Sequence, residues 1–260
     1  MSYVKSKNLL STNNSKTIKG EKLGYETHIL YLAPYNQNSK GINLCSHASV
    51  GCANACLFGS GAARFDSVQL GKVNKTEWFL DNRIEFLLKL DSEITKIKNK
   101  KKYFNSEEKL IPVIRLNGTS DIPFEKFKIR DGKNIFELHS DIQFYDYTKN
   151  HYRFKKELPK NYHLTFSMSE DNREIAFDLL SNGVNVAMVF NIKNSNELPK
   201  TYKGYEVING DNDDLTFLHP KGIILGLKYK KLTGKGASIK NKEALNSDFI
   251  INLDESYTLV

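Results

Sequence analysis

Short apolar runs recur along this chain of 260 residues, and polar residues follow each run directly. The runs have the length of β-strands and are almost continuously apolar, which is typical of strands buried on both faces of a parallel sheet. Between two of them lies a helical pattern over residues 170–182, and Gly183 is placed to end that helix. This alternation predicts an α/β protein. The runs are residues 110–116, 142–145, 162–166, 184–190, 205–208 and 222–227.

The remaining segments complete the expected fold. The first main strand is predicted over residues 25–32, and a loop that contains the cysteines follows it. One long amphipathic helix is expected over residues 76–98, and a mobile surface loop over residues 230–246. We therefore predict a polar lead-in of residues 1–24, with at most a short edge strand, and a single domain of residues 25–260. That domain would be a partial or full α/β barrel of mostly parallel strands, with ligands bound beyond their carboxyl ends.

The charge and hydropathy of the chain bear on its location and partners. The formal net charge of +8 suits a polyanionic partner, but the lysine and arginine residues are spread along the whole chain rather than gathered in one basic segment. No apolar segment approaches the length of a membrane span, and the N-terminal residues lack the apolar core of a signal peptide. We therefore predict a cytoplasmic protein that does not enter a membrane.

All three cysteines, Cys45, Cys52 and Cys56, lie within residues 45–56. Clustered thiols in a chain without a secretion signal indicate a metal site. Three cysteines can hold an iron–sulfur cluster with one iron left open, whereas a structural zinc ion needs a fourth ligand such as His47. The wide spacing favours an iron–sulfur cluster in a loop of residues 41–64 over zinc. A third alternative is that the cysteines are small buried apolar residues.

Polar side chains stand where the predicted strands end. Because the carboxyl ends of parallel strands meet at one edge of a sheet, these side chains are expected to line one pocket with the cysteines and to bind a cofactor there. Each residue taken singly also suits a helix N-cap or a turn. The set is Asn117, Ser120, Asp121, Asp146, Ser167 and Glu170.

Aromatic and basic residues interleave after the strand at residues 142–145. Such a mixture can stack on bases, so nucleic acid is one possible partner. A half-buried strand end followed by a solvated turn has the same composition, and the sequence leaves both interpretations open. The residues are Tyr145, Tyr147, Lys149, His151, Tyr152, Arg153 and Lys155.

Several motifs resemble the gene product 88 family of bacteriophage proteins. They are the cysteine segment of residues 43–57, residues 115–122, residues 144–149 and residues 162–170, with further similarity at residues 210–213 and 222–228. This resemblance indicates relatives rather than an activity.

A weaker similarity is to the radical S-adenosylmethionine enzymes. In those enzymes three cysteines after the first strand of a partial barrel hold a [4Fe–4S] cluster, whose open iron binds the cofactor's amino and carboxylate groups. The cysteine spacing of this chain is wider. The resemblance implies S-adenosylmethionine as a cofactor, with Asp121, after the second strand, as a contact of its amino group.

These observations together predict a phage-type iron–sulfur protein that acts as a radical S-adenosylmethionine-like enzyme on an unidentified substrate. The alternative is a non-catalytic module, stabilised by an iron–sulfur cluster or zinc, that binds nucleic acid or a host protein.

Overall fold

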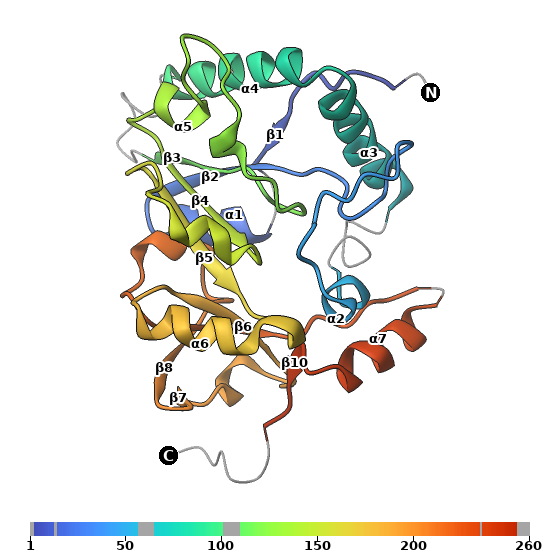
Figure 1. The fold of residues 1–260 in the computed structure, drawn as a ribbon, viewed down its shortest axis with the longest axis vertical. Coiled ribbons are helices and arrows are strands. Elements are labelled where there is room, and N and C mark those ends of the chain that lie inside the picture. Colours follow the sequence, from blue (N-terminus) through green and yellow to red (C-terminus); the bar gives the residue numbers. More distant parts are fainter. Residues whose placement is uncertain (1–2, 13–14, 57–64, 101–109, 235, 254–260) are drawn as a thin grey trace. The chain divides into compact units, whose positions relative to one another are not determined.

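A computed structural model describes residues 3–12, 15–56, 65–100, 110–234 and 236–253 of the chain (Figure 1). Its strands follow the order β1-β2-β3-β4-β5-β6-β9-β8-β7, and β10 pairs with β6 beside this path. Most strand pairs are parallel, which confirms the predicted α/β class. The described strands do not close into a ring, so the predicted barrel is not confirmed.

Each apolar run forms a strand, with ends displaced by a few residues from those expected. The strands are β1 Leu10–Ser11, β2 Tyr25–Leu30, β3 Ile111–Arg115, β4 Gln143–Thr148, β5 Tyr162–Ser167, β6 Val186–Phe190, β7 Thr201–Tyr202, β8 Tyr205–Asn209, β9 Ile224–Lys228 and β10 Ile250–Ile251.

Helices connect most of the strands. They are α1 Ser15–Glu21, α2 Val50–Asn54, α3 Asp66–Asp81, α4 Arg83–Lys98, α5 Ile135–Leu138, α6 Arg173–Ser181 and α7 Ala237–Asn246. Single turns of 3-10 helix are η4 Phe124–Lys126, η5 His151–Lys155, η6 Glu170–Asn172, η7 Ser195–Glu197 and η8 Thr216–Leu218. Within the described ranges, no helix has both the length and the apolar character that crossing a membrane requires.

The chain forms two compact units. The first comprises Met1–Ser46, Phe65–Asp146 and Tyr152–His163, and the second comprises His47–Arg64, Tyr147–His151 and Leu164–Val260. The single domain expected from the sequence stays a prediction.

In the first unit, β3 pairs in parallel with both β2 and β4, and β1 lies antiparallel on the other side of β2. The segment expected to be a polar lead-in therefore contributes a strand to the sheet. Leu9 and Leu10 are buried, and their N–H groups donate to the Glu93 carboxylate of α4 at 2.8 and 3.0 Å. These bonds hold the N-terminal strand against the helix.

Two helices, α3 and α4, replace the single helix expected over residues 76–98, so that prediction is wrong. The Asn82 side chain accepts a hydrogen bond from the Glu85 N–H at 3.2 Å and caps α4, as asparagine often does at N-caps. Phe79 and Phe86 then meet edge to face in the core, with ring centroids 5.4 Å apart. The apolar spacing that suggested one helix is shared between two helices that pack together.

In the second unit, β6 pairs in parallel with β9 on one side and with two strands in succession on the other. Phe166 and Ser167 of β5 pair with the first half of β6, and Ile250 and Ile251 of β10 pair with its second half. β10 therefore pairs with the part of β6 that lies beyond the end of β5. The segment before β10 contains α7, so the prediction of a mobile loop over residues 230–246 is wrong.

Candidate functional site

The cysteine segment of the second unit is tied to the residue that opens η6, just after β5. The Glu170 carboxylate accepts hydrogen bonds from Ser49 Oγ at 2.7 Å and from the Gly51 N–H at 2.6 Å. Ser49 Oγ in turn accepts from the Cys52 N–H at 3.2 Å and caps α2. Hydrogen bonds to a carboxylate are stronger than those between neutral groups, so Glu170 fixes where α2 begins.

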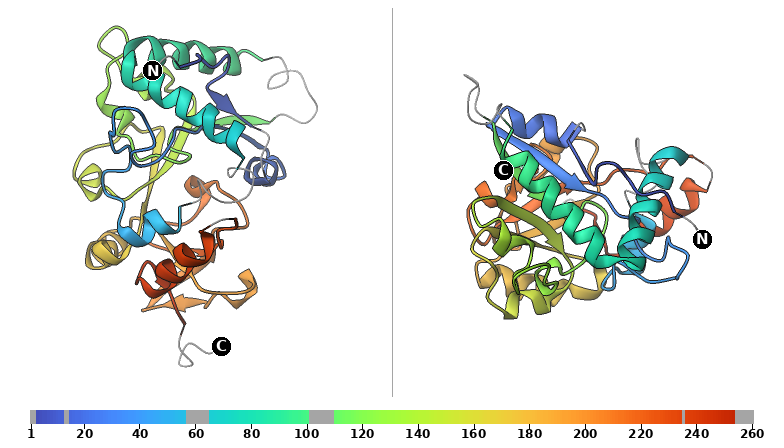
Figure 2. Two further views of the ribbon diagram at one scale, coloured as in Figure 1. Left: turned by 90° about the vertical axis from the view of Figure 1, so that its right-hand side faces the viewer. Right: turned by 90° about the horizontal axis from the view of Figure 1, so that it is seen from above.

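Gly51 permits the close approach on which this anchor depends. A Cβ atom at this position would lie 2.4 Å from Ser247 Oγ, 2.6 Å from Phe249 Cβ and 2.8 Å from Glu170 Oε1. Carbon contacts are optimal near 3.5–4.0 Å, so a larger residue would displace α2 or the connection between α7 and β10. These two helices, α2 and α7, lie side by side (Figures 1 and 2).

We expect Gly51→Ala to lower the free energy of unfolding by roughly 1–3 kcal/mol, the usual cost of overpacking a filled site. Gly71 offers a matched control, because it lies within α3 and has open space around its Cβ position. Gly71→Ala should instead stabilise the protein by up to about 1 kcal/mol, since alanine favours the helix. Urea denaturation measures both variants, and an unchanged stability of Gly51→Ala would contradict the close packing.

Cys52 and Cys56 occupy different positions in the cysteine segment. Cys52 lies within α2, whereas Cys56 follows its end and donates its N–H to the Ala53 carbonyl at 3.3 Å. Neither residue forms a disulfide, and both are partly buried. Residues 57–64 of the predicted cluster loop lie outside the described residues. Cys52 packs against an apolar cluster of Tyr229, Ala244, Phe249 and Ile250.

Cys45 belongs to the first unit. Its N–H donates to Asn43 Oδ1 at 2.8 Å, and its thiol sulfur lies 3.8 Å from the Thr119 carbonyl oxygen. The adjacent Leu44 carbonyl accepts the Asp121 N–H at 2.9 Å. Cys45 is thus held next to the turn that follows β3.

The cysteines supply the donor type of an iron–sulfur or zinc site. Across the part of the chain that the structure describes, no three His, Cys, Asp or Glu side chains form a group that could hold a metal ion. The cysteines therefore match a metal site in the type of their donor atoms, and their described positions define no coordination geometry.

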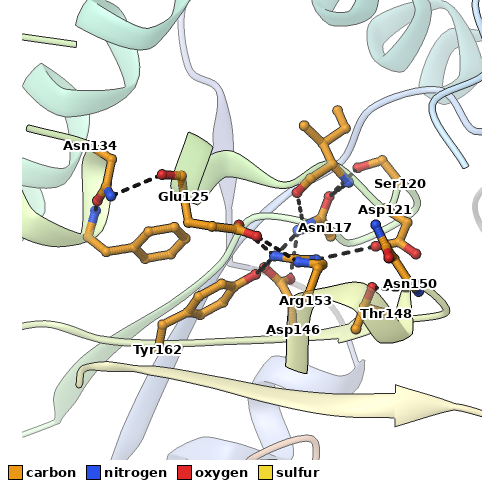
Figure 3. A network of polar contacts seen from close by, with 12 residues as sticks. Asn117, Ser120, Asp121, Glu125, Asn134, Asp146, Thr148, Asn150, Arg153 and Tyr162 are labelled. Carbon is orange, nitrogen blue, oxygen red and sulfur yellow. Dashed lines mark hydrogen bonds and ion pairs between the residues drawn. The ribbon is translucent and has the colours of Figure 1, made fainter. Parts of the chain in front are cut away.

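Three of the predicted site residues are joined directly in the first unit (Figure 3). Asp146 accepts the Asn117 N–H at 2.7 Å and the Asn117 side-chain amide at 3.2 Å. Asn117 Oδ1 accepts from Ser120 Oγ at 2.9 Å and from the Ile122 N–H at 2.8 Å. All three side chains are buried. The structure thus brings Asn117, Ser120 and Asp146 together through bonds to one another.

Asp146 is completely buried in β4. Burial raises the pKa of its carboxyl to about 6. This effect outweighs four groups that lower the same pKa, which are Arg115, the Asn117 N–H, Arg153 and Tyr162. Arg115 Nε lies 3.9 Å from Asp146 Oδ1, and the Tyr162 hydroxyl donates to Oδ2 at 3.0 Å. Burial, together with the nearby Asp146, raises the pKa of Tyr162, so this hydroxyl stays neutral. Asp146 therefore changes charge in a weakly acidic range.

Arg153 links Asp121 to this network. Its guanidinium donates to both Glu125 carboxylate oxygens at 2.9 and 2.8 Å, to Asp121 Oδ1 at 3.3 Å and to the Tyr162 hydroxyl at 2.8 Å. Only 4% of Arg153 is exposed, so two carboxylates compensate its charge inside the protein. The interpretation of Arg153 as a residue that stacks on bases is wrong, because the side chain has almost no free surface.

The other two predicted site residues lie in the second unit. Glu170 anchors the cysteine segment, and Ser167 Oγ lies 2.6 Å from Lys149 Nζ. The pocket predicted to unite all six residues with the cysteines stays a prediction. Sequence reasoning missed Glu125 and Tyr162, and no local signal marks them, because Glu125 lies 28 positions from Arg153 and Tyr162 lies 16 from Asp146.

Comparison with known proteins supports the resemblance to the gene product 88 family. A family model described as "Gene product 88" matches residues 8–251, which include nearly all of the described chain. No curated protein and no solved structure matches the chain.

Proposed function

The chain belongs to the gene product 88 family of phage proteins, and we propose that it is an iron–sulfur protein whose cluster is held by Cys45, Cys52 and Cys56. The observation that carries the proposal is the anchor between Glu170 and the start of α2, the helix that bears Cys52. A helix fixed in advance reduces the ordering that metal binding would otherwise have to impose on the loop.

The proposed cluster is of the [4Fe–4S] type. Its support is the type and number of the donors: three partly buried cysteines, none of them in a disulfide, lie on a short stretch of chain. Zinc is the alternative metal and would need a fourth ligand, for which His47 is the nearest candidate in sequence.

The catalytic form of this proposal is a radical S-adenosylmethionine-like enzyme that acts on an unidentified substrate in the host cytoplasm. When bound, the cluster would supply the electron for cleavage of that cofactor. Asp121 would contact the cofactor's amino group. Glu170 is already bonded to Ser49 and Gly51, so we assign it as a positioning residue for α2. The proposed cofactor contacts are therefore Asn117, Ser120, Asp121, Asp146 and Ser167.

A second candidate function is a non-catalytic module that binds nucleic acid or a host protein. The pairing in the first unit favours it: Asn117, Ser120 and Asp146 already bond to one another, as buried structural residues do. The net charge of +8 suits a polyanionic partner. Turnover of S-adenosylmethionine by the reduced protein would favour the enzyme. Retention of DNA or RNA that weakens steeply with salt, without turnover, would favour the module.

The cluster itself is tested by replacing Cys52. Anaerobically purified protein should contain about four iron and four acid-labile sulfide atoms per chain, and Cys52→Ala should lose most of both. Val50→Ala is the matched control, because Val50 lies in the same helix and is 75% exposed. That variant should keep its full iron content. One tightly held zinc without sulfide, or a Cys52→Ala protein with undiminished metal, would defeat the proposal.

A further inference from the structure

Lys149 and Ser167 form a polar pair in the second unit, and the proposed function gives a role to Ser167 but none to Lys149. Lys149 directly follows β4, Ser167 ends β5, and Lys149 Nζ lies 2.6 Å from Ser167 Oγ. Lys149 is only 9% exposed, whereas Ser167 is partly exposed. The pair thus joins a buried lysine to a serine residue that is partly exposed.

Further contacts help to hold the ammonium group in place. The carbonyl oxygens of Ser167 and Met168 each lie 3.4 Å from Lys149 Nζ, at the long limit of hydrogen bonding. The Phe249 ring centroid lies 5.2 Å away, within the range of a cation–π interaction. The hydroxyl bond is therefore the short one, and the two long bonds can yield to a better acceptor.

The chemistry of the two groups fixes the direction of the short bond. An ammonium group has hydrogens to donate and no lone pair to accept with, so Ser167 Oγ is the acceptor. The hydroxyl hydrogen of Ser167 is consequently directed away from Lys149. A positive charge and a hydroxyl donor thus stand side by side.

We propose that Lys149 and Ser167 bind one anionic group, a carboxylate or a phosphate, of a small-molecule ligand. An ammonium withdrawn from water attracts an anion more strongly than an exposed lysine does, because the local dielectric constant is lower. The Ser167 hydroxyl supplies a second donor at the same place. The carboxyl ends of the strands are also where open α/β sheets bind their ligands.

The same contacts would serve a purely structural lysine that only ties the ends of β4 and β5 together. The two roles differ in one measurable respect, because a structural tie does not bind added anions. The test needs no metal, so its outcome is independent of whether the cysteines hold a cluster.

The experiment titrates the full-length, metal-free protein with inorganic phosphate and, separately, with acetate, at an ionic strength held constant with sodium chloride. Isothermal calorimetry should show saturable binding of one anion per chain. Binding of phosphate alone would assign a phosphate group, and binding of acetate would assign a carboxylate. Ser167→Ala should weaken binding roughly tenfold, the loss expected for one hydrogen bond to a charged group. Lys149→Met should abolish it.

Lys155→Met is the matched control, because Lys155 is exposed over the Tyr152 ring and the variant loses the same charge. Its anion affinity should equal that of the unmodified protein. Ser167→Ala keeps Lys149 and decides the matter if Lys149→Met does not fold. The proposal is overturned if neither anion binds at tens of millimolar, or if Ser167→Ala binds as tightly as the unmodified protein.

Discussion

Replacing Arg153 with methionine should lower the free energy of unfolding by about 3–5 kcal/mol, the usual cost of removing one partner from a buried ion pair. Methionine keeps much of the side-chain length, so the loss would come from the carboxylates of Glu125 and Asp121. Both carboxyl groups would then lie in a partly dehydrated place without the guanidinium that now pairs with them. The Tyr162 hydroxyl would also lose a hydrogen-bond donor.

Urea denaturation measures this effect, and Lys128→Met is its matched control. Lys128 pairs with Glu137 at 3.0 Å, but both side chains are largely exposed to water. An exposed pair contributes at most about 1 kcal/mol, so the control should change little. Equal losses in the two variants would show that Arg153 is not the centre of a buried network.

The second large effect is a pH dependence that Asp146 imposes. As the pH rises from roughly 3 to roughly 8, this residue alone should remove about 3 kcal/mol of stability. The pKa of its carboxyl is about 6 in the folded protein because of burial, and near the ordinary value of about 3.9 in the unfolded chain. Between these two values the folded state binds more protons, so stability falls with rising pH and then levels off.

Asp146→Asn isolates this contribution. Asparagine is nearly isosteric with the protonated acid and does not titrate, so the stability advantage of the unmodified protein over the variant should shrink by about 3 kcal/mol as the pH rises through the range between roughly 3 and 8. Burial lowers the pKa of His139, which contributes a slope of the opposite sign below pH 6.5, but His139 is present in both proteins and cancels. Parallel stability curves for the two proteins would refute a raised pKa of Asp146.

Several features of the fold follow from local sequence. The apolar runs predicted the strands because a strand buried on both faces must be apolar along its whole length. Gly183 was expected to end a helix, and it follows α6 with a φ of +80°, a conformation that favours glycine. The two missed helix features have different causes. Helical spacing continues across Asn82 into a second helix, and α7 is a polar helix whose contacts, rather than its pattern, keep it folded.

The sequence by itself determined the class of the fold, the family, and the residues that end the strands. The rule that parallel strands share a carboxyl edge was enough to expect Asn117 near Asp146. Only the tertiary structure decided the partners. Glu170 bonds to Gly51 across 119 positions, and no local pattern encodes a pairing that depends on which strands become neighbours. The raised pKa of Asp146 likewise comes from complete burial, because it is the dehydration supplied by surrounding segments that penalises the charge.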